Sequence, residues 1–242
     1  MATTRRRPPS SAVVALAVVT FAVTACSGSS TAGRAASPPQ SSPAATSPTG
    51  PTGFPATPPS SSPTITQAEL DAAMLDAADV GHGFVLGTFQ PNTQGGPCEP
   101  TGTPSVDQRV PPEFSAGRTF DSRTVQAEIT QNAAIYSTTA MAAHAFALAV
   151  RGESCRHGLL AGTTQVTISP GQDVTSQVNG NGVGKSTAWQ LTSGSIRAVI
   201  VATLSGRVAD ACIFVAGAKV NTAKLPNPLA LAKAAFDKLL AH

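Results

Sequence analysis

Charged side chains are scarce in this 242-residue chain, and so are aromatic ones. Asp, Glu, Lys and Arg make up 12% of the residues, and the formal net charge is +3. Three of the 16 basic residues, Arg5, Arg6 and Arg7, lie in a segment that we expect to be cleaved, which leaves 13 basic residues against 13 acidic ones. A neutral mature chain has no field that would hold nucleic acid or an anionic lipid surface. We therefore expect no nucleic-acid partner.

The sequence motifs of catalysis and metal binding are also missing. The chain has four histidines and four cysteines, but no His-Glu-x-x-His, Cys-x-x-Cys or Gly-x-Ser-x-Gly. Gly184-Lys185-Ser186 could end a phosphate-binding loop, but Asn179 stands where such a loop needs its first glycine. We expect residues 179–182 to form a tight turn, and we expect no catalytic residue, metal or cofactor. An alternative is a hydrolase whose serine, acid and histidine (His82 or His144) meet only in space.

No apolar run is long enough to cross a bilayer, which takes about 20 residues. Residues 11–23 carry no charge and follow the three arginines, as in a secretory signal peptide. The segment ends in Val23-Thr24-Ala25-Cys26, which resembles the lipobox of bacterial lipoproteins. The resemblance implies a signal peptide over residues 1–25 and acyl chains, palmitate among them, on Cys26, which would anchor the protein to the outer face of the cell membrane. The alternative is an ordinary secretory signal with an incidental cysteine.

Residues 26–63 are expected to form a disordered tether. Beyond Cys26 they are mostly Ser, Thr, Ala, Gly and nine prolines, with one charge, Arg34, and one large apolar residue, Phe54. Such a composition cannot bury enough apolar surface to offset the entropy lost on ordering. The segment would hold the following domain away from the membrane.

Residues 64–242 have the composition of one globular domain, and three helices are predicted within it. Each begins with a capping signal: the Thr66–Glu69 capping box, Thr138 or Thr139, and Asn227 followed by Pro228. Gly81-His82-Gly83 should end the first. The expected helices cover residues 67–78, 140–151 and 228–240.

The remaining patterns predict antiparallel strands. Apolar and polar residues alternate over 123–136, and Ser193-Gly194-Ser195 separates two strand-like runs that should form a hairpin. A Gly- and Pro-rich loop is expected over 91–112. The expected strands cover residues 123–136, 163–169, 185–192, 196–204 and 208–220. Consecutive strands with N-terminal, central and C-terminal helices predict an α+β domain, and we expect the helices to pack on one face of the sheet.

Three cysteines remain after Cys26, and an exported chain permits a disulfide between two of them. Cys98 lies in the long loop and Cys155 just past a predicted helix end, where a bridge would restrain mobile segments. Cys212 lies in a strand pattern, where a buried thiol packs as an apolar residue. We predict a Cys98–Cys155 disulfide and a free Cys212; the alternative is Cys155–Cys212.

Two segments resemble parts of actinobacterial surface lipoproteins and, more distantly, the PknH-like extracellular sensor domains. Residues 70–84 look like the opening helix that ends in a Gly-Phe pair, and residues 135–155 look like the strand–helix–cysteine segment. The resemblance implies an α+β sensor or binding domain with a groove. Those sensor domains typically carry two disulfides, and the resemblance places a partner for Cys212 near Val166, where this chain has no cysteine.

We therefore predict a lipid-anchored, non-catalytic domain that binds a small molecule, lipid or glycan, or a neighbouring envelope protein. A groove for a ligand should lie between the sheet and a helix. Trp189 and Tyr136, each the only residue of its type, should be buried in the core, and either could instead line the groove. The alternatives are the envelope hydrolase and a purely structural or interaction module.

Overall fold

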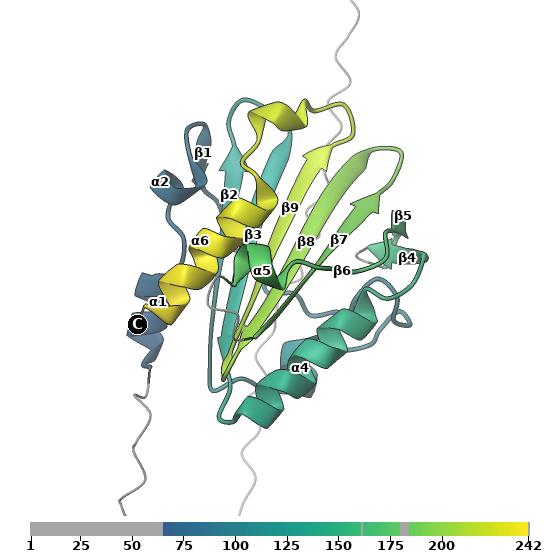
Figure 1. Ribbon diagram of the computed structural model, residues 1–242. Coiled ribbons are helices and arrows are strands. Elements are labelled where there is room, and N and C mark those ends of the chain that lie inside the picture. Colours follow the sequence, from purple (N-terminus) through teal and green to yellow (C-terminus); the bar gives the residue numbers. More distant parts are fainter. Residues whose placement is uncertain (1–64, 161, 180–183, 242) are drawn as a thin grey trace, which may run out of the picture. The chain divides into compact units, whose positions relative to one another are not determined.

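A nine-stranded antiparallel sheet organises the part of the chain that the computed structural model describes, residues 65–160, 162–179 and 184–241 (Figure 1). The strand order is β1-β2-β3-β9-β8-β7-β5-β4, and β6 pairs with β7 outside this path. The strands are β1 (Phe84–Leu86), β2 (Phe114–Ser122), β3 (Ala127–Ile135), β4 (His157–Leu160), β5 (Thr164–Ile168), β6 (Gln172–Asp173), β7 (Lys185–Thr192), β8 (Ile196–Ser205) and β9 (Val208–Gly217). The expected α+β class is confirmed.

The predicted β7–β8 hairpin is confirmed, and its turn is held by side-chain hydrogen bonds. The Ser193 hydroxyl oxygen accepts the backbone N–H groups of Ser195 and Ile196. From there the chain continues into β9, which pairs with β8 on one side and β3 on the other. The long central strands β3, β8 and β9 thus form the rigid middle of the sheet.

Helix capping follows the sequence signals. The Thr138 hydroxyl accepts the Met141 N–H, and the Asn227 side chain accepts the N–H groups of Leu229 and Ala230, which satisfies donors that a helix N-terminus leaves free. The helices are α1 (Gln67–Ala73), α2 (Ala77–Val80), α3 (Val106–Arg109), α4 (Thr139–Gly152), α5 (Thr175–Val178), the short 3-10 helix η1 (Thr222–Lys224) and α6 (Pro228–Leu240).

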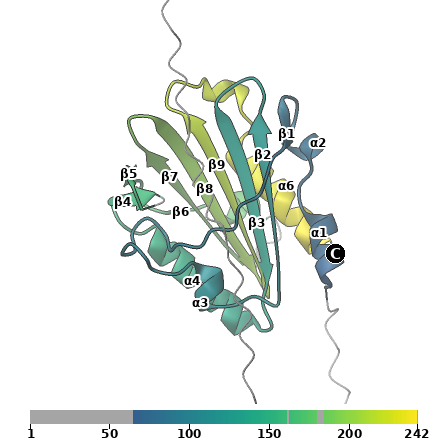
Figure 2. The same ribbon diagram turned by 180° about the vertical axis from the view of Figure 1, so that it is seen from behind.

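The two long helices cover opposite faces of the sheet, so the expectation that the helices pack on one face is wrong. Val201 of β8 packs with α6, whereas its neighbours Ala198 and Ala202 pack with α4. Side chains alternate between the faces of a strand, so these residues point to opposite sides. Figures 1 and 2 show α6 in front of the strands in one view and behind them in the other. The apolar run of β8 is nearly continuous, which is typical of a strand buried on both faces. The sequence therefore already indicated that helices would cover both faces.

The single helix predicted over 67–78 is also wrong, because a buried glutamine interrupts it. The Leu75 N–H, which a continuing helix would bond to its own backbone, donates to Gln131 Oε1 of β3 at 2.8 Å. Asp76 then begins α2 with a capping box of its own. The Thr66–Glu69 capping box of α1 is confirmed, and Gly81, with φ of 104°, follows the end of α2 as expected.

Several elements were not predicted: β1, β2, β4, β6, α3 and α5. In β2 the apolar residues Phe114, Ala116 and Phe120 alternate with polar or small residues, but Arg118 interrupts this series. The strand predicted from 123 begins only at Ala127, because the Ser122 hydroxyl accepts the N–H groups of Thr124 and Val125 and turns the chain there. The predicted 91–112 loop contains α3, and the predicted strand 208–220 ends at Gly217.

A candidate ligand-binding cleft beside α4

A cavity of about 190 Å³ lies between α4, the face of the sheet that α4 covers, and the segment 92–107. We call it the α4 cleft. It lies where a groove was expected, between the sheet and a helix. Its floor is formed by β3, β7, β8 and β9, and its walls by α4 and by the 92–107 segment.

Alanines on both sides leave the space open. Ala145, Ala149 and Glu153 are four residues apart, so they form one stripe of α4 and its end that borders the cleft. The sheet opposite also presents small side chains. They are Ala134 of β3, Ala202 of β8, and Ala209 and Ala211 of β9. Methyl groups facing one another cannot fill the gap that larger core residues keep between a helix and a sheet, so the cavity follows from the sequence of these strands.

Aromatic side chains border the apolar part of the cleft. Trp189 of β7 and Tyr136 are 1% and 2% exposed, and both line the cavity together with Phe146 of α4. The expectation that they are core residues is confirmed, and both also border this cavity. Their rings provide a flat apolar surface against which a ligand could pack.

The first of two carboxyl groups at the cleft is that of Asp107, in α3. Burial raises the pKa of Asp107, and hydrogen bonds from Asn132 and Tyr136 oppose the shift in part. The Tyr136 hydroxyl donates to Asp107 Oδ1 at 3.5 Å, and its own pKa is raised by burial and by that neighbouring carboxyl. Asp107 is thus a polar group positioned by a side chain of β3 and by the residue that follows β3, at the edge of an apolar space.

The second carboxyl group, that of Glu153, has no partner of opposite charge. Burial, and then repulsion by Glu99, raise its pKa to about 8. Its Oε2 atom is buried and has no hydrogen-bond partner among the described residues. The nearby guanidinium groups bind Glu99 instead: Arg109 contacts both its oxygens at 2.7 and 2.8 Å, and Arg151 lies 3.9 Å from Oε1. Burial alone would raise the pKa of Glu99. The two arginines and the Gly96 N–H, which stabilise the Glu99 carboxylate, outweigh burial, so the pKa of Glu99 is lowered.

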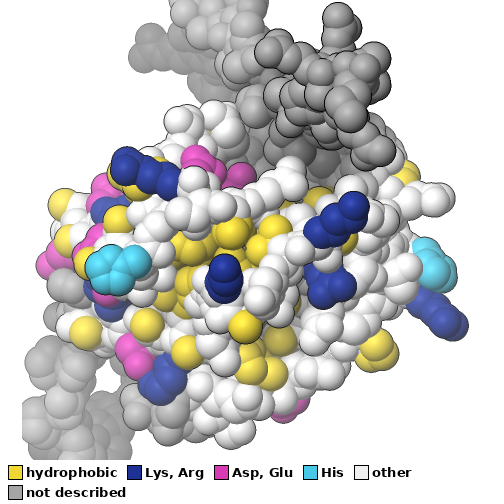
Figure 3. Space-filling model, turned by 90° about the horizontal axis from the view of Figure 1, so that it is seen from above, with side chains coloured by type: hydrophobic (Ala, Val, Ile, Leu, Met, Phe, Trp, Pro, Cys, Tyr) yellow, Lys and Arg dark blue, Asp and Glu magenta, His cyan; other side chains and the backbone are white. Residues whose placement is uncertain are grey.

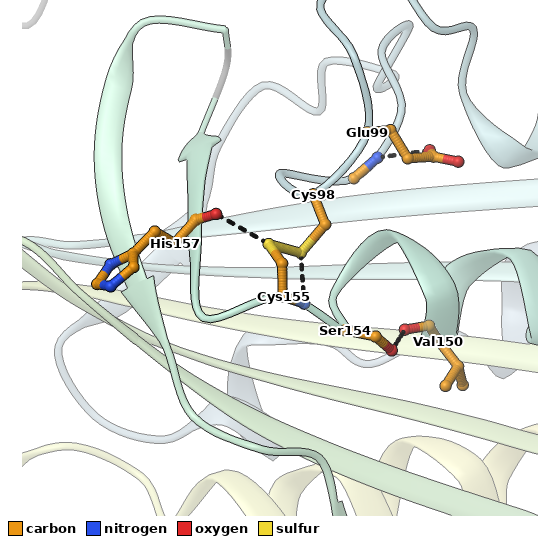
Figure 4. Close-up of a disulfide and its surroundings, with 7 residues drawn as sticks. Cys98, Glu99, Val150, Ser154, Cys155 and His157 are labelled. Atoms are coloured by element: carbon orange, nitrogen blue, oxygen red, sulfur yellow. Dashed lines mark hydrogen bonds between the residues drawn. A yellow bond between two sulfur atoms is a disulfide. The ribbon is translucent and has the colours of Figure 1, made fainter.

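The expected Cys98–Cys155 disulfide is present, and it fixes the 92–107 wall to the end of α4 (Figure 4). Its Cα atoms are 5.5 Å apart, and Cys212 is free and buried. The Cys98 N–H donates to the Gly152 carbonyl at 2.9 Å. Gly96 packs so closely on Gly152 that a Cβ on Gly96 would lie 2.6 Å from the same carbonyl oxygen. The wall is therefore covalently tied and tightly packed at one end.

Cys212 lies on the other face of the sheet, in a buried polar network. Its thiol donates to Asp210 Oδ2 at 3.5 Å, and Gln131 Nε2 donates to Asp210 Oδ1 at 3.1 Å. Val166, where the resemblance placed a partner cysteine, lies on β5, three strands away from β9. Three strand spacings are on the order of 14 Å, which no disulfide spans. A cysteine at position 166 would therefore be too far from Cys212 for a disulfide in this fold, and Cys212 is free, as predicted.

A second cavity, of about 100 Å³, lies between the ends of β3, β8 and β9 and the segment from η1 to α6. Apart from Glu128, Arg197 and Thr222, its lining is apolar. Figure 3 views this end of the molecule and shows hydrophobic side chains gathered in a hollow with Lys and Arg side chains around it. Few polar groups here could fix the orientation of a ligand, so we place the candidate site in the α4 cleft.

The described residues contain no assembled catalytic or metal centre. His82 and His144 are exposed, and no hydrogen bonds in this part of the chain connect a serine, a histidine and a carboxylate. Within the same residues, no group of three His, Cys, Asp or Glu side chains could hold a metal ion. No helix of the described chain is long and apolar enough to cross a membrane.

Sequence reasoning found part of this site. Cys98, Cys155, Trp189 and Tyr136 were singled out, whereas Asp107 and Glu153 were missed. The four-residue spacing that continues from Ala145 through Ala149 to Glu153 was a readable signal for the latter. Asp107 lies in a segment that was expected to be irregular, so the sequence around it carried no signal of a site. Cys26, the 1–25 leader and the 26–63 tether lie outside the described residues, as do positions 180–182 of the expected turn.

Comparison with known proteins supports the fold. No protein-family model and no curated protein sequence matches the chain. Among solved structures, the chain is similar to the extracellular domain of PknH from Mycobacterium tuberculosis, with a TM-score of 0.54 and 9% sequence identity. The similarity covers 74% of this chain and 98% of that domain. The chain therefore has a PknH-like extracellular-domain fold.

Proposed function

We propose that this protein is a lipid-anchored lipoprotein whose extracytoplasmic domain binds a ligand in the α4 cleft without transforming it. The observation that carries the proposal is the cleft itself: an apolar space with two carboxyl groups, walled by a disulfide-restrained segment. Ligand sites in proteins combine apolar linings with a few placed polar groups in this way. A small molecule, lipid or glycan, or a side chain of a neighbouring envelope protein, would occupy it.

A binding role fits the cleft better than a catalytic one. Among the described residues that line it, no serine, threonine or histidine is hydrogen-bonded to Asp107 or Glu153, as nucleophilic catalysis would require. The Tyr136 hydroxyl does donate to Asp107, but burial and that carboxyl raise the pKa of Tyr136 and so oppose its ionisation to a nucleophile. The fold shared with the PknH extracellular domain agrees with a role outside the cytoplasm. The hydrolase and structural-module alternatives predict, respectively, turnover of an envelope substrate and an empty cleft.

Filling the cleft should abolish ligand binding. We expect the full-length protein, extracted from its own cell envelope and analysed by native mass spectrometry, to carry a bound mass. Ala149→Phe would place a ring in the cleft and should remove that mass. Ala147→Phe is the matched control, because Ala147 lies on the same helix but is exposed. An empty wild-type protein, or full retention of the mass by Ala149→Phe, would refute the proposal.

The anchor is tested separately at Cys26. We expect Cys26→Ala to shift the protein from the membrane fraction to the soluble fraction, because the acyl chains are the proposed source of its membrane affinity. Mass spectrometry of the wild-type N-terminal peptide should show diacylglycerol and acyl masses. A variant that still sediments with membranes, together with an unmodified wild-type peptide, would rule out lipid anchoring.

A further inference from the structure

We infer that the α4 cleft selects a cationic ligand, an amine carried on an apolar or aromatic body, whose positive charge lies against the Glu153 carboxylate. The inference rests on the proposed function and specifies its ligand class. It follows from three features of the cleft: the signs of its charges, the buried oxygen of Glu153 that lacks a partner, and the aromatic lining.

The charges that border the cleft have one sign. Asp107, Glu153 and Asp210 line it, the Asp210 carboxyl being hydrogen-bonded to Gln131 and Cys212, and none of the described residues that line it is Lys, Arg or His. Of the two arginines near Glu153, Arg109 is held by Glu99 through two short hydrogen bonds, and Arg151 lies 3.9 Å from Glu99 with its side chain mostly in solvent. Neither forms an ion pair with Glu153 in the described structure. An anionic ligand would find no positive charge in this space, whereas a cation could pair with a carboxylate.

Glu153 lacks the partner that a buried carboxylate needs. Leaving a buried charge without a counter-ion or hydrogen bonds is unfavourable, and such a group becomes neutral instead. The Oε2 atom of Glu153 is buried and has no hydrogen-bond partner among the described residues. An ammonium group would supply both the opposite charge and the donors, so a cationic ligand gains from Glu153 what a neutral ligand cannot.

The aromatic lining suits the rest of such a ligand. Trp189, Tyr136 and Phe146 border the same cavity. An ammonium group is attracted to the face of an aromatic ring, and an apolar body packs on it. The alanine stripe of α4 leaves room for that body beside the rings. Charge and shape thus favour one ligand class.

Binding should also be linked to proton release. Glu153, with a pKa of about 8 in the free protein, is mostly neutral at pH 6, and a cation that binds the carboxylate must displace its proton. Affinity should then rise by up to about tenfold per pH unit from pH 6 to pH 8. Four charged or titratable groups lie around Glu153. Glu99 of the 92–107 wall repels it, and Asp107 lies across the cleft. Arg109 of α3 and Arg151 of α4 contact Glu99.

The test uses three probes of one skeleton: phenethylamine, phenethyl alcohol and phenylacetate. Binding to the full chain is measured by NMR titration, with the Trp189 indole signal as the reporter of the cleft. We expect the amine to bind at least about tenfold more tightly than the alcohol, and phenylacetate to bind more weakly than either. Glu153→Gln should reduce amine affinity to that of the alcohol and leave the alcohol unchanged.

The control variant is Glu128→Gln. Glu128 is also a carboxyl whose pKa is raised by burial and by a neighbouring acid, Asp121, but it does not line the cleft. It should leave all three affinities unchanged. Equal binding of amine and alcohol, no amine binding at millimolar concentration, or an unaffected Glu153→Gln variant would each overturn the inference. Alcohol binding that is lost in Ala149→Phe would uphold the cleft as a binding site while the charge selectivity failed.

Discussion

Removing the Cys98–Cys155 disulfide should lower the free energy of unfolding by about 4 kcal/mol. The two cysteines are 57 residues apart, and the chain-entropy relation gives about 4 kcal/mol for a closed loop of that length at 25 °C. The bond also ties the 92–107 wall to the end of α4, so we expect this segment to open locally and become the first site of proteolysis in the unbridged protein. Urea unfolding of Cys98→Ser/Cys155→Ser beside the wild type measures the difference.

Reduction provides the control for this measurement. A reducing agent should bring the unfolding midpoint of the wild type down to that of the double variant and leave the double variant unchanged, because Cys212 is its remaining thiol in the domain and is unpaired and buried. Identical midpoints for the reduced and oxidised wild type would contradict the prediction.

Asp210→Asn should make the protein more stable at alkaline pH, by up to about 4 kcal/mol at pH 8. Burial raises the pKa of Asp210 to about 7 from an ordinary value of 3.8, although hydrogen bonds from Gln131 and Cys212 oppose the shift. The unfolded chain therefore loses its proton first as pH rises. Between about pH 4 and pH 7 the wild type loses stability, at about 1.4 kcal/mol for each unit of pKa difference. Asparagine keeps the side-chain oxygen that accepts from Gln131 and has no charge to bury.

The comparison is made by urea unfolding of both proteins across this pH range. The two should be similar near pH 4 and diverge toward pH 7, after which the difference stays constant. Glu153 also has a raised pKa in the folded protein, but it is present in both proteins, so its contribution cancels in the difference between their free energies of unfolding. Asp237→Asn, an exposed aspartate of α6 paired with Lys233, should follow the wild type at every pH. A wild type that gains stability relative to Asp210→Asn as pH rises would show that Asp210 is ionised in the folded protein throughout.

Local chemistry made several elements predictable. The Thr66–Glu69 box, Thr138 and Asn227 fix helix starts through hydrogen bonds to residues two or three positions away, and the β7–β8 hairpin is fixed by a short turn. The disulfide was predictable because both cysteines border irregular segments of a chain that its leader predicts to be exported. The leader and tether are properties of composition and of the residues before Cys26, and they remain predictions.

Other features depend on partners distant in sequence, and the tertiary structure decided them. The break between α1 and α2 arises because Gln131, 56 residues further on, takes the Leu75 N–H. The placement of α4 and α6 on opposite faces depends on contacts of β8 with two helices far from it in sequence: Val201 packs with α6, and Ala198 and Ala202 pack with α4.

The candidate site combines both kinds of information. The sequence by itself determined an alanine-rich helix, the cysteine pair and the two unique aromatic residues. Only the tertiary structure brought Asp107, Tyr136, Glu153 and Trp189 around one cavity, because they come from α3, the end of β3, the end of α4 and β7. Hydrogen bonds within a helix or turn can be read from neighbouring residues, whereas a cavity depends on which non-neighbouring surfaces meet and how far their side chains reach.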